Sequence, residues 1–169
     1  ADLTHSNYTD IAGETGSYQP ETPEKRYLHF GVREHAMAAV LNGIAYHNSG
    51  LIPYGGTFLV FADYMRGSMR LSALSMLGVI YVLTHDSIGV GEDGPTHQPI
   101  ETIPSLRAMP GMLVFRPGDG NETSGAYKLA IENRNRPSAM CLSRQGMANQ
   151  ANSSIAKVAF GGYILEDCA

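Results

Sequence analysis

The clearest pattern along the chain is an uninterrupted apolar run from Val79 to Leu83. Such a run lacks the alternation of a half-exposed strand and is typical of a strand that is covered on both faces in a parallel sheet. Apolar residues elsewhere recur at helical spacing. A helix from about Arg33 to His47 is predicted by four residues that share one of its faces, namely Met37, Val40, Leu41 and Ile44.

Further elements follow the same two periodicities, with glycines between them. Gly55 and Gly56 are expected to end a strand, and Thr57 is placed to cap the helix that follows. The other predicted elements are strands at Tyr27 to Phe30, Leu51 to Tyr54, Met112 to Phe115 and Ala139 to Leu142, and helices carrying Phe58, Phe61 and Met65, near Glu101 to Ala108, and from about Glu122 to Asn133 with Asn121 as cap. This alternation predicts a three-layer α/β/α fold with a mainly parallel sheet.

The length of 169 residues suits one domain, which we place at residues 1–150. Residues 5 to 26 are rich in Ser, Thr, Gly, Pro and Glu and are interpreted as a long surface connection. Residues 151–169 are interpreted as a linker toward a C-terminal domain that lies outside this chain, with Gly161 and Gly162 before the start of a new strand.

Charge and cysteine content narrow the classes of partner. The net charge of −4 comes from scattered residues of both signs, without the basic stripe that nucleic acid selects. No apolar stretch approaches the roughly 20 residues that span a bilayer, so no membrane partner is expected. Cys141 and Cys168 show no metal-site or disulfide spacing, which favours a reducing compartment.

The segment H-D-S-I-G-V-G-E-D-G-P-T-H-Q-P, residues 85 to 99, contains a G-x-G-x-x-G pattern directly after the apolar run. Pro95 and two acidic residues stand where a dinucleotide loop would lead into a helix, so a Rossmann site is disfavoured. The carboxyl end of a buried strand is nevertheless where open α/β sheets bind ligands. Five polar residues gather there, namely His85, Asp86, Glu92, Asp93 and His97, which suit a polyhydroxylated substrate, with a metal site as the rival interpretation.

A second glycine pattern, Gly118-Asp119-Gly120, resembles the start of the magnesium and diphosphate motif of thiamin-diphosphate enzymes. That motif ends in Asn-Asn about two dozen residues later, whereas here Asn149 is followed by Gln150. We therefore interpret the pattern as a turn with a capped helix start.

Four segments together resemble the central, pyrimidine-binding domain of the transketolase family. They are G-V-R-E-H at 31–35, Y-G-G-T-F-L-V-F-A-D-Y at 54–64, T-H-D-S-I-G-V-G-E-D-G-P-T-H-Q-P at 84–99 and L-S-R-Q at 142–145. The resemblance implies a thiamin-diphosphate-binding fold whose first strand and helix are expected to be missing from residues 1–150. It also implies a transferase that moves a two-carbon ketol unit from a ketose phosphate to an aldose phosphate, in the pentose phosphate pathway or the reductive pentose phosphate cycle.

The resemblance also implies residue roles. Glu34 would hydrogen-bond the cofactor's pyrimidine nitrogen and favour the tautomer that takes the proton from the thiazolium carbon, which is general acid–base catalysis. Phe58, Phe61 and Tyr64 would line the aminopyrimidine pocket. His85 and Arg144 would bind the phosphate of the sugar phosphate, Asp93 would bind a hydroxyl, and His97 would lie near its first carbons. His85 and His97 are expected to be catalytic residues together with Glu34.

Thiamin diphosphate and Mg²⁺ are the implied cofactors, with no metal ligand expected in this chain because the family holds the ion on another domain. The family also implies a homodimer with the active site at the subunit interface. A related thiamin enzyme is one alternative, and an excised, non-catalytic dimerisation or binding module is another. The wording A-D-Y-M-R-G-S-M-R at 62–70 is similar to plant and algal enzymes and favours the plastid stroma over the cytoplasm.

Overall fold

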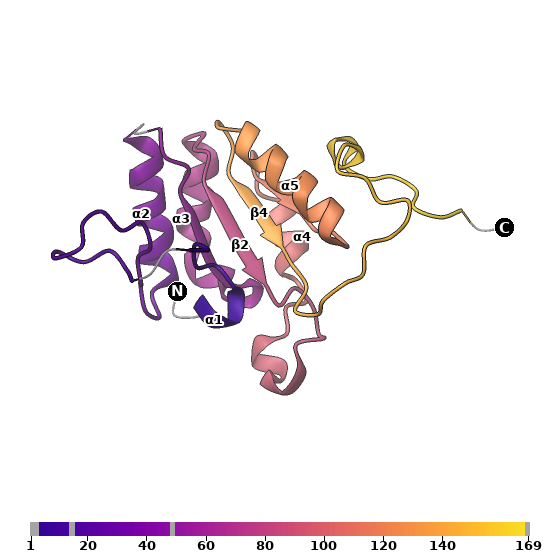
Figure 1. The fold of residues 1–169 in the computed structure, drawn as a ribbon, viewed down its shortest axis with the longest axis horizontal. Helices are drawn as coiled ribbons and strands as arrows, with labels where there is room; N and C mark the ends of the chain where they lie inside the picture. Colours follow the sequence, from indigo (N-terminus) through magenta and orange to yellow (C-terminus); the bar gives the residue numbers. More distant parts are fainter. Residues whose placement is uncertain (1–3, 14–15, 48–49, 168–169) are drawn as a thin grey trace.

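The computed structural model describes residues 4–13, 16–47 and 50–167, so Cys168 lies outside the described residues. Its centre is one parallel sheet of order β1-β2-β4-β3 (Figure 1). The strands are β1 Tyr54–Phe58, β2 Ile80–Thr84, β3 Leu113–Phe115 and β4 Ser138–Cys141. The helices are α1 Thr4–Asn7, α2 Glu34–Tyr46, α3 Ala62–Leu74, α4 Thr102–Arg107 and α5 Gly120–Glu132, and short 3-10 helices are η1 Leu59–Phe61, η2 Gly91–Asp93, η3 Pro95–His97 and η4 Lys157–Phe160.

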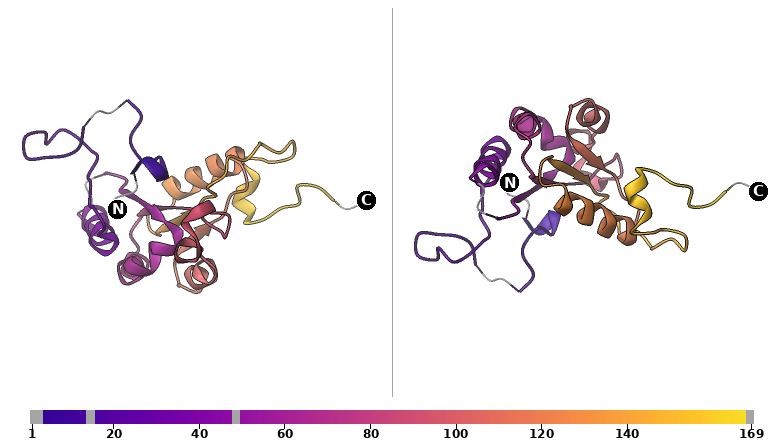
Figure 2. Two further views of the ribbon diagram at one scale, coloured as in Figure 1. Left: turned by 90° about the horizontal axis from the view of Figure 1, so that it is seen from below. Right: turned by 90° about the horizontal axis from the view of Figure 1, so that it is seen from above.

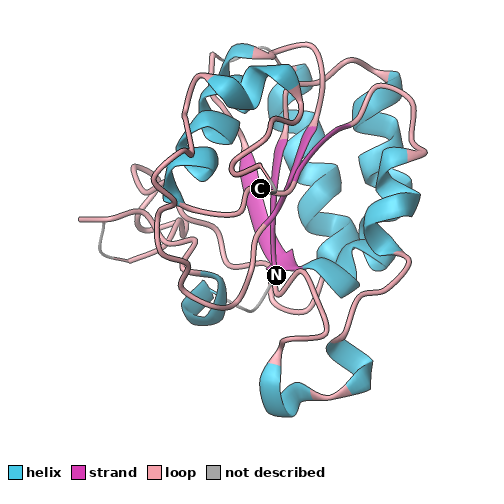
Figure 3. Cartoon of the chain, turned by 90° about the vertical axis from the view of Figure 1, so that its right-hand side faces the viewer, coloured by secondary structure: helices cyan, strands magenta, loops and turns pink. Residues whose placement is uncertain are grey.

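The helices form a layer on each face of the sheet (Figures 2 and 3). One face is covered by α2, α3 and α4, and the other by α5 with the short α1. Strand β2 shows why both faces must be covered. Tyr81 and Leu83 belong to the core on the α2–α3–α4 side, and Ile80 and Val82 belong to the core under α5. The predicted α/β/α fold with a parallel sheet is confirmed.

Strand β1 corrects the prediction that Gly55 and Gly56 end a strand, because both glycines lie inside it. A Cβ added to Gly55 would lie 2.6 Å from Leu41 Cδ1 of α2. On the opposite face, a Cβ added to Gly56 would lie 2.7 Å from Thr9 Cγ2. The two glycines therefore let neighbouring segments approach the strand closely from both sides, and do not interrupt it.

Strand β1 also changes the start of the next helix. Phe58 is the last residue of the strand, and α3 begins at Ala62 after the 3-10 turn η1. Thr57 is fully buried within β1 and caps no helix, so the predicted cap was wrong. The predicted cap Asn121 was also wrong, because Asp119 accepts the hydrogen bond from Glu122 N at 2.9 Å and caps α5.

The predicted strand at Tyr27 to Phe30 is not formed. Its carbonyl at Tyr27 accepts a hydrogen bond from Tyr18 N at 2.7 Å, but the segment pairs with no strand among the described residues. The preceding segment is not purely a surface connection either. Asn7 of α1 and Thr9 are buried against the sheet, and Tyr54 donates its hydroxyl hydrogen to Thr9 O at 2.7 Å.

The stretch predicted to be a linker packs on α5. A Cβ added to Gly125 of α5 would lie 2.5 Å from Ile155 O and 2.7 Å from Val158 Cγ2. Val158 belongs to η4, which thus lies directly against the helix. Whether residues 151–169 lead to a further domain stays a prediction. No helix among the described residues is long and apolar enough to cross a membrane.

A buried polar network joins α2, α3 and β2. Ser72 Oγ lies 2.6 Å from the Tyr81 hydroxyl and 2.5 Å from Asn42 Oδ1. Burial raises the pKa of Tyr81 to about 12, so its hydroxyl stays protonated and can donate. The network satisfies polar groups inside the core and fixes how α2 sits on α3.

Candidate active site at the carboxyl edge of the sheet

Four rings meet at the carboxyl ends of β1 and β2, and we call them the ring cluster: Phe58, Phe61, His85 and His97. The ring of His85 stacks on Phe58 with centroids 3.6 Å apart. Phe58 and Phe61 lie parallel at 6.0 Å, and His97 meets Phe61 edge-on at 5.1 Å. The register of the sheet explains why Phe58 and His85 meet, because Phe58 pairs with Thr84, the residue before His85.

His85 is held in an unusual backbone conformation at the end of β2. Its φ is +59°, in the left-handed region that costs a non-glycine residue about 1–2 kcal/mol. The Thr84 hydroxyl lies 3.0 Å from His85 Nδ1, and the imidazole is buried against Phe58. Burial lowers the pKa of His85, Asp93 raises it, and Arg144 and His97 lower it. The neutral imidazole is therefore favoured at neutral pH.

Polar and charged side chains surround the ring cluster. Asp93 of η2 and Arg144, which follows β4, are both exposed and both act electrostatically on His85. The Thr96 hydroxyl lies 2.8 Å from His97 Nδ1. Tyr64 lies 6.1 Å from Phe61 by ring centroids, and 69% of its surface is exposed. The structure thus brings together seven of the eight predicted site residues.

Glu34, the eighth, is the first residue of α2. Helix α2 begins at the end of the molecule that holds the strand arrowheads, so Glu34 lies at the same edge as the ring cluster (Figure 1). Only 7% of its surface is exposed, and no side-chain hydrogen bond to Glu34 is found among the described residues. Its carboxylate oxygens are not among the fully buried atoms without a hydrogen-bond partner, so the acid is largely enclosed but still open to a ligand.

Two members of the predicted acidic and histidine cluster do not join the site. Asp86 is buried and accepts a hydrogen bond from Arg116 Nε at 2.9 Å, on the far side of β4. Glu92 is exposed. Within the described ranges, no three His, Cys, Asp or Glu side chains are arranged to hold a metal ion.

Sequence reasoning missed the contacts that support the loop between residues 85 and 99. Gln145 donates from Nε2 to Gly89 O, and Gln98 donates to Ile88 O at 3.3 Å. Arg116, the partner of Asp86, was also missed. Its position directly after β3 was the available signal, because residues that follow parallel strands gather at one edge.

The geometry defines an α/β domain suited to binding a flat heterocycle and a phosphate beside an acid suited to proton transfer. A parallel α/β domain carries at its carboxyl edge stacked aromatic rings, two imidazoles, an exposed arginine and a largely buried glutamate that has no side-chain hydrogen bond within the described ranges. Flat rings suit a flat heterocycle, arginine suits a phosphate, and the buried acid suits proton transfer.

The comparisons with known proteins agree. A family model described as transketolase, pyrimidine binding domain, matches residues 1–149, so the chain belongs to this family. It is 62% identical to the transketolase of Nostoc sp. over 99% of this chain and 25% of that protein, and 62% identical to the chloroplastic transketolase of Solanum tuberosum over 99% of this chain and 22% of that protein.

A solved structure of a Pichia stipitis transketolase in complex with sedoheptulose 7-phosphate superposes with a TM-score of 0.94 at 51% identity, over 100% of this chain and 26% of that one. The chain thus spans about a quarter of the length of the relatives that it matches. The family and the thiamin-diphosphate-binding fold inferred from the sequence are confirmed.

Proposed function

We propose that this chain is the pyrimidine-binding part of a transketolase that moves a two-carbon ketol unit from a ketose phosphate to an aldose phosphate. The observation that carries the proposal is Glu34, a largely buried residue at the same edge as the ring cluster with no side-chain hydrogen bond among the described residues, in a chain of this family. The full-length relatives are named transketolases, which supports the activity.

The residues present fit a bound thiamin cofactor. Phe58, Phe61 and Tyr64 offer apolar and aromatic surface to the aminopyrimidine ring, and Glu34 offers a carboxylate to a ring nitrogen. When bound, the cofactor supplies the carbon that carries the ketol unit. Glu34 would hold the proton at the pyrimidine nitrogen and return it, which is general acid–base work.

The sugar phosphate is proposed to lie over the ring cluster. His85 and Arg144 would bind its phosphate, Asp93 would accept a hydrogen bond from a hydroxyl, and His97 would lie near its first carbons. A neutral His85 donates from one ring nitrogen, and the Arg144 guanidinium donates two parallel hydrogen bonds. The related Pichia stipitis structure with its sugar phosphate supports this class of substrate.

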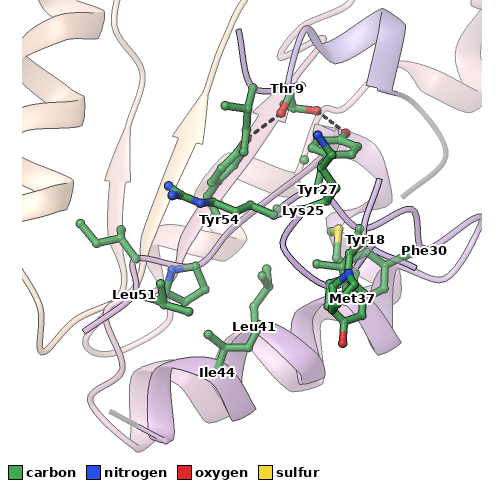
Figure 4. Close-up of a pocket in the computed structure, with 18 of the residues that line it drawn as sticks. Thr9, Tyr18, Lys25, Tyr27, Phe30, Met37, Leu41, Ile44, Leu51 and Tyr54 are labelled. Carbon is green, nitrogen blue, oxygen red and sulfur yellow. Dashed lines mark hydrogen bonds between the residues drawn. The ribbon is translucent and has the colours of Figure 1, made fainter. Parts of the chain in front are cut away.

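Sequence outside these 169 residues is proposed to complete the fold and the site. A cavity of about 580 Å³ separates the segment 23–30 from α2 and from the outer edge of β1 (Figure 4). Met37, Leu41 and Ile44 of α2 line this cavity, and in the described part of the chain β1 is paired only with β2. An additional strand beside β1 would fill this space, and Mg²⁺ with the diphosphate would be held on another domain.

A homodimer is proposed through the outer surface of α2 and α3. Five large apolar side chains of these helices are exposed, namely Val40, Tyr46, Tyr64, Leu71 and Leu74. A second copy of the chain would remove these apolar side chains from water. The chloroplastic relatives favour the plastid stroma over the cytoplasm, and fractionation of the cells that make the protein would test this.

The test is a ketol-transfer assay of the full-length protein and of residues 1–169, each with thiamin diphosphate and Mg²⁺. We expect that only the full-length protein transfers the ketol unit. The 169-residue chain should be inactive and should bind the cofactor weakly. A full-length protein that binds cofactor and sugar phosphate but transfers no ketol unit would support the non-catalytic module instead.

A further inference from the structure

One ion pair crosses the carboxyl edge beside the ring cluster. Asp86 lies two residues after β2 ends, and Arg116 directly follows β3. These strands are not neighbours, because β4 lies between them, so the 2.9 Å contact from Arg116 Nε to Asp86 Oδ2 bridges over the end of β4. The pKa of Cys141, which ends β4, is raised by burial and by Asp86 and lowered by Arg116, as this placement requires.

The pair is asymmetric in burial. Asp86 has 8% of its side chain exposed, whereas Arg116 has 50%. Arg116 is its only side-chain partner among the described residues. Removing the guanidinium would leave a buried carboxylate uncompensated, and the backbone around residue 86 would have to move to rehydrate it.

The residue beside Asp86 is His85, whose left-handed backbone is strained. Strain of this kind persists only where surrounding contacts over-determine the conformation. The contacts here are the stacking on Phe58, the Thr84 hydroxyl on one side, and the anchored Asp86 on the other. Releasing Asp86 removes the anchor that lies immediately after His85 in the chain.

We propose that Asp86 and Arg116 are positioning residues that hold the His85 imidazole where it meets the phosphate of a sugar phosphate. The proposal rests on the proposed function of His85 and adds a pair of residues that do not themselves contact the substrate. The loss of either partner should therefore weaken the binding of substrates that carry a phosphate. The binding of ketol donors without a phosphate should be nearly unaffected.

The test uses the full-length protein with the variants Asp86→Asn, Arg116→Gln and the double substitution. KM and kcat are measured with fructose 6-phosphate and with hydroxypyruvate, an unphosphorylated ketol donor. Each single variant should raise KM for fructose 6-phosphate about tenfold, with kcat and the KM for hydroxypyruvate changed less than about threefold. The double variant should match the single variants, because both remove the same contact. Glu132→Gln, which breaks the exposed ion pair with Lys128, is the matched control and should change neither KM.

Asp86→Asn separates positioning from direct binding, because it retains Arg116. Normal KM for fructose 6-phosphate in this variant would overturn the proposal, and a raised KM in Arg116→Gln beside it would make Arg116 a phosphate ligand. Equal losses with both donors would also overturn it and indicate general damage to the fold. If the wild-type protein transfers no ketol unit, the proposed function fails, and crystal structures of the variants decide the inference separately. His85 should then leave its left-handed conformation and its stacking on Phe58, and an unchanged His85 would refute its positioning by the pair.

Discussion

Gly125→Ala sets two effects of opposite sign against each other. Alanine stabilises a helix interior by about 1 kcal/mol relative to glycine. The new Cβ, however, would lie 2.5 Å from the carbonyl oxygen of Ile155 and 2.7 Å from Val158 Cγ2. Both distances are far inside the optimal separation of about 3.5–4.0 Å. Overpacking of this kind costs about 1–3 kcal/mol, so we expect a net loss of up to about 2 kcal/mol.

Gly43→Ala is the matched control. Gly43 also lies inside a long helix, α2, but a Cβ there meets no atom of another segment within 4 Å. This variant should therefore gain about 1 kcal/mol, as helix propensity alone predicts. The two variants should differ by about 1–3 kcal/mol although the chemical change is identical.

Urea unfolding of the 169-residue chain measures the free energy of unfolding of both variants. Limited proteolysis reports on the packing of residues 151–167. Gly125→Ala should be cleaved faster in this segment, because Ile155 and Val158 must move away from α5. Equal stabilisation of both variants, with unchanged cleavage, would show that the segment does not pack on the helix.

Three further outcomes are expected. Tyr81→Phe should cost about 1–2 kcal/mol in urea unfolding, because Ser72 loses its 2.6 Å hydrogen-bond partner inside the core; no loss would refute the network. Burial lowers the pKa of His85 against the opposing effect of Asp93, so the unfolded chain takes up the proton first and stability should fall as pH drops below about 6.5. His85→Gln should flatten that fall. In the full-length protein, Asp93→Ala should relax the selection between aldose phosphates epimeric at the second carbon, and unchanged selectivity would make Asp93 structural.

Strands and helices were predictable where burial alone sets the order of their apolar and polar residues. The apolar run that forms β2 has core on both faces. Met37 and Leu41 of the predicted apolar face of α2 lie in the core, whereas Val40 is exposed. Prediction failed where a glycine serves a contact that is distant in sequence. Gly55 and Gly56 resemble strand breakers locally, and only the approach of Leu41 and Thr9 explains them. The extended segment at Tyr27 to Phe30 has the pattern of a strand but no strand partner among the described residues.

The candidate site was predictable in its location and less so in its contacts. Residues after parallel strands share one edge, which places His85 near Phe58. The ion pair of Asp86 with Arg116 was not predictable, because Arg116 follows a strand that is distant from Asp86 in the sequence. Glu34 resembles a solvated charge at a helix start, and resemblance to the family was needed to single it out before its burial was seen.

The central claim is that Glu34 activates the cofactor, and exchange of the thiazolium proton with solvent deuterium tests it most directly. Glu34→Gln in the full-length protein keeps the size of the side chain, so α2 should pack as before, but an amide cannot take up and return the proton. The account predicts that the variant still binds thiamin diphosphate and exchanges the proton at least about 100-fold more slowly, a loss of about 3 kcal/mol in transition-state stabilisation. Exchange at the wild-type rate with cofactor bound would contradict it.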